Sequence, residues 1–451
     1  MSIGSITALI VNIISMPIIT RVYVPSDIGT FAALHVFSLF LFPIFSMRLE
    51  IIFGQKINTS KLKNLLLTSI LIGLSFSIIS FILLFVLAKY LEKYLLINFL
   101  SFIIVLPVFL TLFQYGIGIL NHLKLYKSIA IISTLGIFFQ KFFQIIFGII
   151  MQDKTMAIFL SYCIPTFFFA LITFFIIHKK INIFKNIKFS FNDIKEYSDH
   201  IFYRVSYSLS NFFKDRFIII LIITFFSADQ AGLYSQALGL LLIPTAIFSI
   251  PIKTIITREY QENSKNTINM IVIIYNMLIN ILLPVYVYLF FNSSHLFPII
   301  FGQDWAQMSN IFNILLAPMF ILIFSTSFDR LYDVLGAQKY AFLFEFFFGI
   351  FCFGSFFLMA YLNFEFIEAL KVNSVILILF FTTFIIFILN RAKEMISFMR
   401  TAKYFFFQTL FCSTLFLLIK DNLFYSTLLL FAIVLIGLLI TKNDLKKELI
   451  F

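Results

Sequence analysis

Charged and polar side chains inside long apolar segments are the residues of this sequence best suited to chemistry. Arg204, Ser208, Asn211 and Asp215 follow one another at intervals of four, three and four residues, which places them on one face of a helix. The other charges inside apolar segments are basic at Arg48, Lys141, Lys214 and Arg216 and acidic at Glu50 and Glu345. A charge at the centre of a bilayer costs about 2.5 to 3.5 kcal/mol. We therefore expect these groups to line a hydrated internal cavity that is cationic on balance.

An alternative interpretation is that the same charges form local ion pairs. Lys214 and Arg216 flank Asp215, and Arg48 lies two residues from Glu50. Structural ion-pair networks perturb charged groups just as functional sites do. The sequence alone leaves both interpretations open for each residue.

Nothing in the sequence indicates catalysis or a bound cofactor. It has no GxxxxGK[ST] phosphate-binding loop and no HExxH zinc motif, and its five histidines are scattered. Cys163, Cys352 and Cys412 lie in apolar runs, where a thiol acts as a small hydrophobic group. We expect no metal, no cofactor and no enzymatic activity. A proton or sodium ion could drive transport.

The elements that carry these charges are membrane-spanning helices. Hydrophobic residues make up 61% of the 451 residues and charged residues 12%, which leaves more apolar surface than a water-soluble core can bury. A helix needs about 20 apolar residues to cross the hydrocarbon layer. Fourteen such helices are expected, near residues 2–20, 26–53, 65–88, 96–120, 128–151, 156–177, 200–226, 231–257, 267–291, 306–328, 340–362, 372–390, 402–420 and 423–441.

The expected helices divide into six, six and two, and the two sets of six are related. Asp27 and Gly29 after the first helix are echoed by Asp229 and Gly232 after the seventh, and Leu-Pro-Val-Phe at 106–109 is echoed by Ala-Pro-Met-Phe at 317–320. Six helices separate the copies, which indicates a parallel repeat about an axis along the bilayer normal. We expect an N-terminal six-helix bundle at 1–177, a cytoplasmic linker at 178–199, a C-terminal six-helix bundle at 200–390, and two helices with a cytoplasmic tail at 391–451.

Basic residues between the helices indicate the orientation in the membrane. If the N-terminus is cytoplasmic, the cytoplasmic loops and tail hold 22 Lys and Arg residues and the opposite loops hold six. The positive-inside rule then places both termini in the cytoplasm. The first apolar run has no basic leader and no small-residue cleavage site, so we expect it to be kept as the first helix.

Several short motifs follow one another along residues 1 to about 345. They are RVYVPSDIGTFA at 21–32, MRLE at 47–50, DR at 215–216, AGLYS at 231–235, FGQDW at 301–305 and VLGAQK at 334–339. They resemble the R-x-Y-x-P-x-D-x-G-x-[FY]-A signature and the R-x-E, D-R, G-x-Y-S, FGxxW and VLGxxK elements of oligosaccharide flippases of the polysaccharide-biosynthesis family. Members of that family begin with more residues before the first helix, so Met1 is expected to be a late start or the chain to be clipped.

The resemblance implies the MATE-like fold of the multidrug/oligosaccharidyl-lipid/polysaccharide exporter superfamily and, within it, a Wzx-type flippase. Such a protein moves undecaprenyl-diphosphate-linked oligosaccharide repeat units from the cytoplasmic to the periplasmic leaflet of the bacterial inner membrane by alternating access. Its product supplies O-antigen (lipopolysaccharide), capsule or exopolysaccharide assembly. The implied partners are this lipid-linked oligosaccharide, membrane lipid, and the polysaccharide polymerase and chain-length machinery, with no nucleic acid.

Arginine binds phosphate oxygens through paired hydrogen bonds, so a cationic cavity suits a diphosphate cargo. The candidate substrate-binding residues are Arg48, Lys141, Arg204, Ser208, Asn211, Lys214 and Arg216. The candidates for coupling to a proton or sodium ion are Glu50, Asp215 and Glu345.

Two other functions compete with this one. A cation-coupled drug or metabolite antiporter of the same superfamily should hold its cationic cargo with acids inside the membrane, whereas the charges here are net basic. A membrane polysaccharide polymerase should carry a long periplasmic loop, whereas the external loop at 292–305 has only about 14 residues.

Overall fold

The computed structural model describes residues 3–55, 57–90, 94–183, 188–249, 251–253, 256, 264–328, 338–391, 395–419 and 423–448. Every regular element in this part of the chain is a helix. The chain forms two compact units, Met1–Ser235 (unit 1) and Gln236–Phe451 (unit 2).

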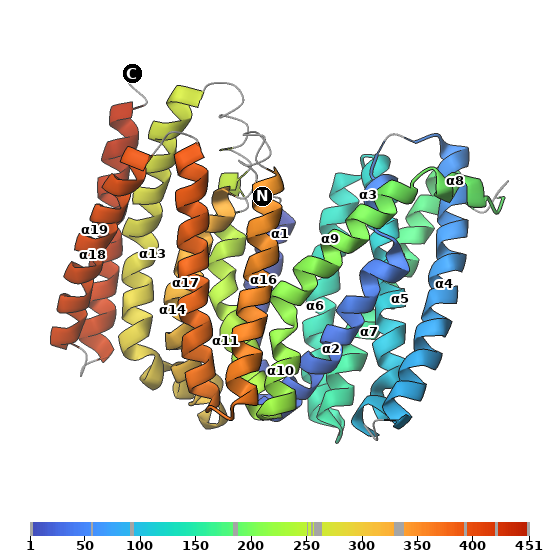
Figure 1. Ribbon diagram of the computed structural model, residues 1–451, viewed down its shortest axis with the longest axis horizontal. Coiled ribbons are helices and arrows are strands. Elements are labelled where there is room, and N and C mark those ends of the chain that lie inside the picture. Colours follow the sequence, from blue (N-terminus) through green and yellow to red (C-terminus); the bar gives the residue numbers. More distant parts are fainter. Residues whose placement is uncertain are drawn as a thin grey trace. The chain divides into compact units, whose positions relative to one another are not determined.

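Unit 1 contains a series of long helices joined by short connections (Figure 1). They are α1 (Ile3–Val22), α2 (Pro25–Ser46), α3 (Glu50–Phe53), α4 (Thr59–Tyr90), α5 (Tyr94–His122), α6 (Tyr126–Ile150), α7 (Lys154–Ile181), α8 (Phe191–Lys195), α9 (Ser198–Arg216), α10 (Ile218–Phe225) and the first part of α11 (Ala228–Pro244). Helix α5 packs against α2, α4 and α7, and α6 packs against α1 and α7.

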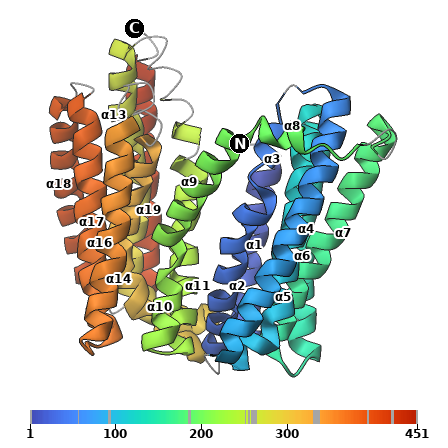
Figure 2. The same cartoon turned by 45° about the vertical axis from the view of Figure 1, so that its right-hand side comes forward.

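Unit 2 continues from α11 into a second set of helices (Figure 2). They are the π-helical turn η1 (Thr245–Ser249), α13 (Ser264–Phe301), the 3-10 turn η2 (Gln303–Trp305), α14 (Met308–Phe328), α16 (Gln338–Tyr361), α17 (Phe366–Arg391), α18 (Met395–Ile419) and α19 (Leu423–Glu448). Helix α13 packs against α14, α18 and α19, and α17 packs against α14 and α16.

Local sequence explains where several of these helices begin and end. Pro25 starts α2, where its missing amide costs nothing, and the Asp27 carboxylate accepts a hydrogen bond from the Val24 amide at 3.2 Å. Helix α7 begins after Asp153, whose carboxylate caps the Met156 amide at 2.9 Å, and ends at the left-handed Asn182 with a φ of 45°.

Within the described residues each of the fourteen expected spans coincides with a helix or a broken pair of helices, which confirms the all-helical polytopic fold. Ten helices of the described chain are long and apolar enough to cross a membrane, and Leu9–Val22 and Leu423–Leu438 are shorter apolar helices. The protein is therefore a multi-pass membrane protein. The expected continuous helix at 26–53 is instead interrupted after Ser46, and the one at 200–226 has a turn at Phe217.

Both repeated prolines lie inside helices of the described chain. Pro107 lies inside α5 of unit 1, and Pro318 lies inside α14 of unit 2. Cys163, Cys352 and Cys412 are free and buried in apolar surroundings, as their sequence context predicts.

One core cluster of unit 1 supports the break between α2 and α3. Phe53, Leu62, Tyr115, Ile119 and Ile177 come from α3, α4, α5 and α7, and none of them is exposed. A rigid packed layer of this kind fixes the backbone on either side of it. The turn at Met47 and Arg48 comes shortly before Phe53 in the sequence. This turn carries the first candidate site.

Candidate functional site

The turn between α2 and α3 has an unusual backbone. Met47 and Arg48 are both left-handed, with φ of 46° and 54°, although neither is glycine. Each such residue is held in a sparsely populated region that persists only where the surroundings enforce it. Tyr115 donates a hydrogen bond from its hydroxyl to the Ser46 carbonyl at 2.8 Å, and the Arg48 amide donates to Ser46 Oγ at 3.2 Å.

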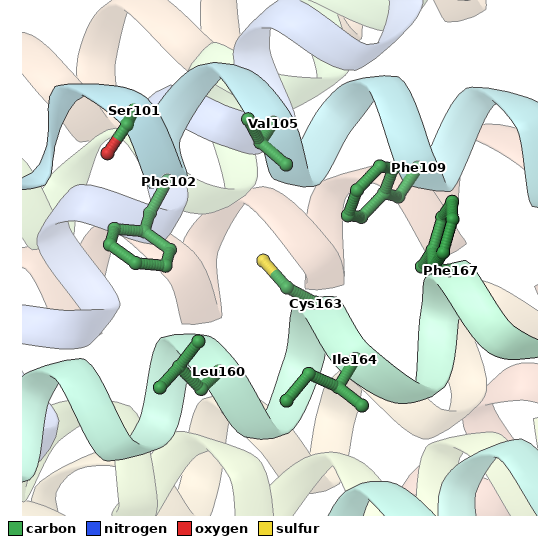
Figure 3. Close-up of a pocket in the computed structure, with 8 residues that line it drawn as sticks. All are labelled: Ser101, Phe102, Val105, Phe109, Leu160, Cys163, Ile164 and Phe167. Carbon is green, nitrogen blue, oxygen red and sulfur yellow. The ribbon is translucent and has the colours of Figure 1, made fainter.

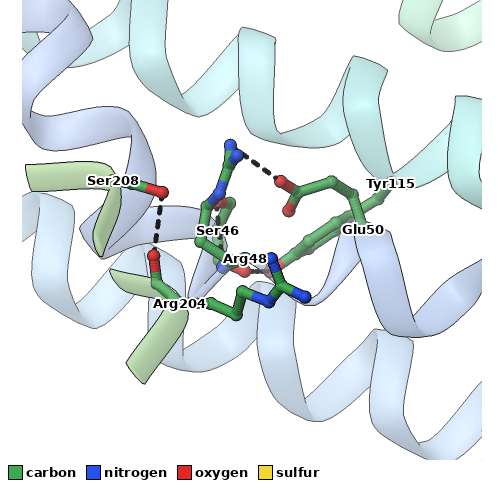
Figure 4. A network of polar contacts seen from close by, with 6 residues as sticks. All are labelled: Ser46, Arg48, Glu50, Tyr115, Arg204 and Ser208. Atoms are coloured by element: carbon green, nitrogen blue, oxygen red, sulfur yellow. Dashed lines mark hydrogen bonds and ion pairs between the residues drawn. The ribbon is translucent and has the colours of Figure 1, made fainter. Parts of the chain in front are cut away.

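Arg48 forms an ion pair with Glu50 across this turn (Figure 4). The distance from Arg48 Nη1 to Glu50 Oε1 is 3.0 Å, and the side chains are 29% and 12% exposed. The guanidinium also lies 5.8 Å from the centre of the Phe42 ring. Arg48 Nε and Glu50 Oε2 are buried and have no hydrogen-bond partner within the described chain. The local ion pair considered as the alternative from sequence is therefore present, and it leaves donor capacity on Arg48 unused.

Glu50 lies between two candidate spans, Pro25–Ser46 and Thr59–Leu87. Burial raises the pKa of its carboxyl above the ordinary value, and the Arg48 guanidinium acts in the opposite direction. The charge state of Glu50 thus depends on whether Arg48 stays beside it.

Helix α9 brings a second arginine to the same turn. His200 lies close to the backbone of Arg48, and Arg204, one helical turn further along α9, acts electrostatically on His200. Figure 4 shows the exposed Arg204 side chain extending toward the turn. The Arg204 side chain thus approaches the turn that carries Arg48, while the Arg48 guanidinium itself points toward Glu50.

The structure shows how the residues of the predicted polar stripe are oriented around α9. Phe212 is buried against α2, where its ring lies 5.6 Å from that of Phe40, and Ile201 packs on the core cluster. Arg204 and Ser208 lie beside this packing face, and Ser208 Oγ donates to the Arg204 carbonyl at 2.8 Å. The serine hydroxyl is thus used within its own helix.

Three other members of the predicted set cannot be placed in the same way. The side chains of Asn211, Lys214 and Asp215 lie outside the described residues, although the α9 backbone runs through them. Their predicted roles remain predictions.

Arg216, at the end of α9, faces a different group of residues. It acts electrostatically on His35 of α2 and on Tyr162 of α7. The rings of these two residues lie 5.3 Å apart, and His35 stacks on Phe31 at 5.1 Å. His35 and Arg48 are 13 residues apart, or roughly 20 Å along a helix. The candidate cations therefore lie at two places along α2, one at the α2–α3 turn and one near His35.

The last two candidates lie on other helices, Lys141 on α6 and Glu345 on α16. Lys141 Nζ donates to Gln144 Oε1 at 3.3 Å on α6, and the Gln144 carbonyl accepts a hydrogen bond from Tyr23 at 2.6 Å. Glu345 is half-buried on α16 of unit 2.

Sequence reasoning missed His35, His200 and Tyr162. A histidine inside an apolar span is itself an unusual ionisable group, so His35 had a signal that was available. His200 and Tyr162 had none, because their importance comes from contacts with residues far away in the sequence.

An apolar groove opens between α5 and α7 (Figure 3). Its volume is about 320 Å³, and Phe102, Phe109, Cys163 and Phe167 are among the side chains that line it. Ser101 is its one polar lining residue. Such a groove suits a hydrocarbon chain and gives no means of holding a phosphate. Within the described residues no group of His, Cys, Asp and Glu is arranged to hold a metal ion.

Comparisons with known proteins agree with this architecture. A model of the polysaccharide biosynthesis protein family matches residues 18–310. No curated protein sequence matches the chain. Among solved structures, the lipid II flippase MurJ in an inward closed conformation is similar with a TM-score of 0.72 and 14% identity, over 100% of this chain and 99% of that one.

Two transporters of the MOP superfamily are also similar. An inward-facing multidrug resistance MATE family transporter gives a TM-score of 0.59 and 11% identity, over 87% of this chain and 95% of that one. A transporter from Pyrococcus furiosus gives a TM-score of 0.50 and 10% identity, over 86% of this chain and 93% of that one. At these identities the likeness establishes the fold, which is that of MurJ and the MATE transporters.

Proposed function

This chain belongs to the polysaccharide biosynthesis protein family, and from that premise we propose that it is a flippase for undecaprenyl-diphosphate-linked oligosaccharide. It carries the repeat unit from the cytoplasmic to the periplasmic leaflet of a bacterial inner membrane. The product enters the assembly of O-antigen, capsule or exopolysaccharide, where a polymerase and chain-length machinery act on it. Both termini are cytoplasmic in this proposal.

The observation that carries the proposal is the pair of arginines at the α2–α3 turn. A diphosphate cannot cross hydrocarbon without compensation for its charge. Arg48 lies in a left-handed turn, its Nε has no hydrogen-bond partner within the described chain, and the Arg204 side chain extends toward this turn. Two guanidinium groups supply the planar, paired donors that phosphate oxygens accept. A lipid II flippase has the same fold, and its cargo is also a lipid.

The remaining candidates have supporting roles in this proposal. Arg216, with His35 and Tyr162, forms a second cationic place along the path, and Lys141, Asn211 and Lys214 add polar and basic groups to it. The carboxyls of Glu50, Asp215 and Glu345 are the positions at which a proton or sodium ion would couple to transport. Among them, Glu50 is directly paired with the proposed phosphate ligand Arg48.

A drug antiporter of the same superfamily is the less favoured function. It would need an acid free to hold a cationic cargo, whereas Glu50 is already neutralised by Arg48 at 3.0 Å. The family match also concerns polysaccharide biosynthesis.

The proposal is tested by deleting the gene and analysing the lipid-linked glycans of the cell. We expect one undecaprenyl-diphosphate-linked glycan to accumulate on the cytoplasmic side and surface polysaccharide to disappear. The wild-type gene and the control Lys89→Gln, which changes an exposed cation at the end of α4, should restore it.

Arg48→Gln should fail to restore export, but it also leaves Glu50 buried without its partner. The double variant Arg48→Gln/Glu50→Gln removes both charges and should return to normal abundance while staying inactive. Normal surface polysaccharide in the double variant would refute the proposed role of Arg48. Normal polysaccharide in the deletion strain would refute the proposed function itself.

A further inference from the structure

Two prolines interrupt the backbone hydrogen bonding of helices that lie within candidate membrane spans. Pro107 lies in α5 and Pro318 in α14, and both are buried. A proline has no amide hydrogen, so it cannot donate to the carbonyl four residues before it. The carbonyls of Ile103 and Ile314 therefore lose the bond that a continuous helix would give them.

A serine from a neighbouring helix caps each of these carbonyls. Ser38 Oγ of α2 donates to the Ile103 carbonyl oxygen at 3.1 Å, and Ser374 Oγ of α17 donates to the Ile314 carbonyl oxygen at 2.7 Å. Ser38 is 0% and Ser374 5% exposed. Hydrocarbon offers no partner to a free carbonyl, so the two hydroxyls meet a need that the prolines create.

The two serines direct their hydroxyls away from their own helices. Ser161 and Thr173 of α7, in contrast, donate to carbonyls three and four residues earlier in the same helix. A helical serine always has such a carbonyl within reach. Ser38 and Ser374 can therefore exchange the bond to the other helix for one within their own helix, so that neither hydroxyl is left unpaired.

A third bond between a serine and a carbonyl offers a matched contrast on α14. Ser249 Oγ of η1 donates to the Ile323 carbonyl oxygen at 2.8 Å, and Ser249 is 0% exposed. The residue four positions later is Ser327, which keeps its amide hydrogen. The Ser249 bond thus adds to a carbonyl that α14 itself can satisfy, whereas the bonds at the prolines replace a missing backbone bond.

The missing backbone bond makes each proline the place where its helix can bend. Sharp bends in helices occur mostly at prolines, because the ring crowds the preceding turn and one hydrogen bond is absent. The segments of α5 on either side of Pro107 can change their angle while their own hydrogen bonds stay intact. The serine bond ties the carbonyl at this point to α2, and the bond at Pro318 ties α14 to α17 in the same way.

We infer that Pro107 and Pro318 are bending joints, and that Ser38 and Ser374 are latches that hold these joints in the conformation shown. When a joint bends, its carbonyl moves away from the serine, which then donates within its own helix. A flippase must open first to one leaflet and then to the other, so the role of the joints in transport rests on the proposed function. The capping of the two carbonyls does not.

A cycle of single and double variants in unit 2 tests the latch through the thermal midpoint of the purified protein. We expect Ser374→Ala to lower the midpoint by about 1 to 3 °C, because the Ile314 carbonyl is left unpaired. Pro318→Ala supplies an amide hydrogen for that carbonyl, so Ser374→Ala should lower the midpoint much less in this background. Ser249→Ala is the matched control, and its effect should be equal with proline or alanine at position 318.

Ser38→Ala and Pro107→Ala form the same cycle in unit 1, with the same expectation. Equal effects of the serine variants in the proline and alanine backgrounds would overturn the latches. An effect of Ser249→Ala that also disappears with Pro318→Ala would show a general change in α14, and it would overturn the latch on that helix.

Transfer of the undecaprenyl-diphosphate-linked glycan between the leaflets of liposomes tests the joints. Pro107→Ala and Pro318→Ala should each slow transfer by a factor of about three or more at equal protein content, because a continuous helix resists bending. Neither variant should lower the thermal midpoint. Pro298→Ala is the control and should keep the wild-type rate, since Pro298 lies in the last turn of α13, where a bend moves little of the helix.

Each other result of the transfer assay also has a definite meaning. Wild-type rates in both joint variants would overturn the joints while leaving the flippase proposal in place. Equal slowing by Pro298→Ala would show an effect of removing any helical proline, which would overturn the joints too. A wild-type protein that transfers no lipid would overturn the proposed function together with the joints, whereas the thermal cycles decide the caps independently.

Discussion

Gly29 of α2 and Gly232 of α11 bring their two helices into backbone contact. A Cβ atom at Gly29 would lie 1.8 Å from the Ala228 carbonyl oxygen, and one at Gly232 would lie 1.9 Å from the Pro25 carbonyl oxygen. The contact is reciprocal, because residues 25 and 29 meet residues 228 and 232, each 203 positions later. The loosely repeated Asp-Gly motif of the sequence is thus a pair of segments that pack against each other.

We predict that Gly29→Ala and Gly232→Ala each destabilise the protein by about 1 to 3 kcal/mol, because a methyl group has no space between the two backbones. The thermal midpoint of the purified protein should fall for both. Gly239→Ala on the same helix α11 is the control, since a Cβ there meets nothing within 4 Å. The double variant should cost less than the sum of the singles, because one separation of the helices accommodates both methyl groups. Unchanged midpoints in both single variants would contradict the contact.

A second prediction concerns the hydrogen bond that supports the left-handed turn. Tyr115→Phe removes the donor to the Ser46 carbonyl and should cost about 1 kcal/mol of stability. Export should fall by more than protein abundance, since the turn directs Arg48. Tyr90→Phe, at a position that is 84% exposed, should change neither. Export that tracks abundance alone would show that Tyr115 acts only in packing.

A third prediction follows from the raised pKa of Glu50. A carboxyl whose pKa is raised by folding stabilises the protein at low pH, and this contribution is lost as pH rises through the folded-state pKa. The Arg48 guanidinium lowers the pKa of Glu50 and so opposes the effect of burial. Arg48→Gln should therefore raise this pKa further and shift the loss of stability to higher pH. Glu50→Gln should abolish it. The measurement is the thermal midpoint across a pH series, and identical pH profiles for wild type and Glu50→Gln would contradict the assignment.

A fourth prediction concerns orientation. The two ends of α7 should lie on opposite sides of the membrane, with residue 180 in the cytoplasm. A membrane-impermeant maleimide should label Gln152→Cys in intact cells and Lys180→Cys only after the inner membrane is opened. Both positions are exposed, and the native cysteines are buried at 0% to 7% exposure and can be replaced by alanine. The reverse pattern of labelling would invert the topology and the proposed direction of transport.

Most of the fold could be predicted from the sequence because apolar length is a direct physical signal. In the described part of the chain every expected span coincides with helical structure, and Pro107 and Pro318 both lie inside helices. The break after Ser46 was not predictable. Met47 and Arg48 are neither glycine nor proline, and their left-handed backbone is enforced by Tyr115, which is 69 residues away from Ser46.

The candidate site was predictable in composition and less so in arrangement. The ion pair between Arg48 and Glu50, one of the two interpretations from sequence, is present, and the two residues are only two positions apart. Charge placement did not indicate that His200 and Arg204 approach that pair while Arg216 faces His35.

The central claim is that Arg48 holds the diphosphate of a lipid-linked glycan during its passage across the membrane. The most direct measurement reconstitutes the purified protein in liposomes and follows the transfer of an undecaprenyl-diphosphate-linked glycan between leaflets. We predict transfer by the wild-type protein and by Lys89→Gln, and at least a tenfold slower transfer by Arg48→Gln/Glu50→Gln at equal protein content, as the loss of a charge-assisted phosphate contact requires. Transfer at the wild-type rate by that double variant would contradict the account.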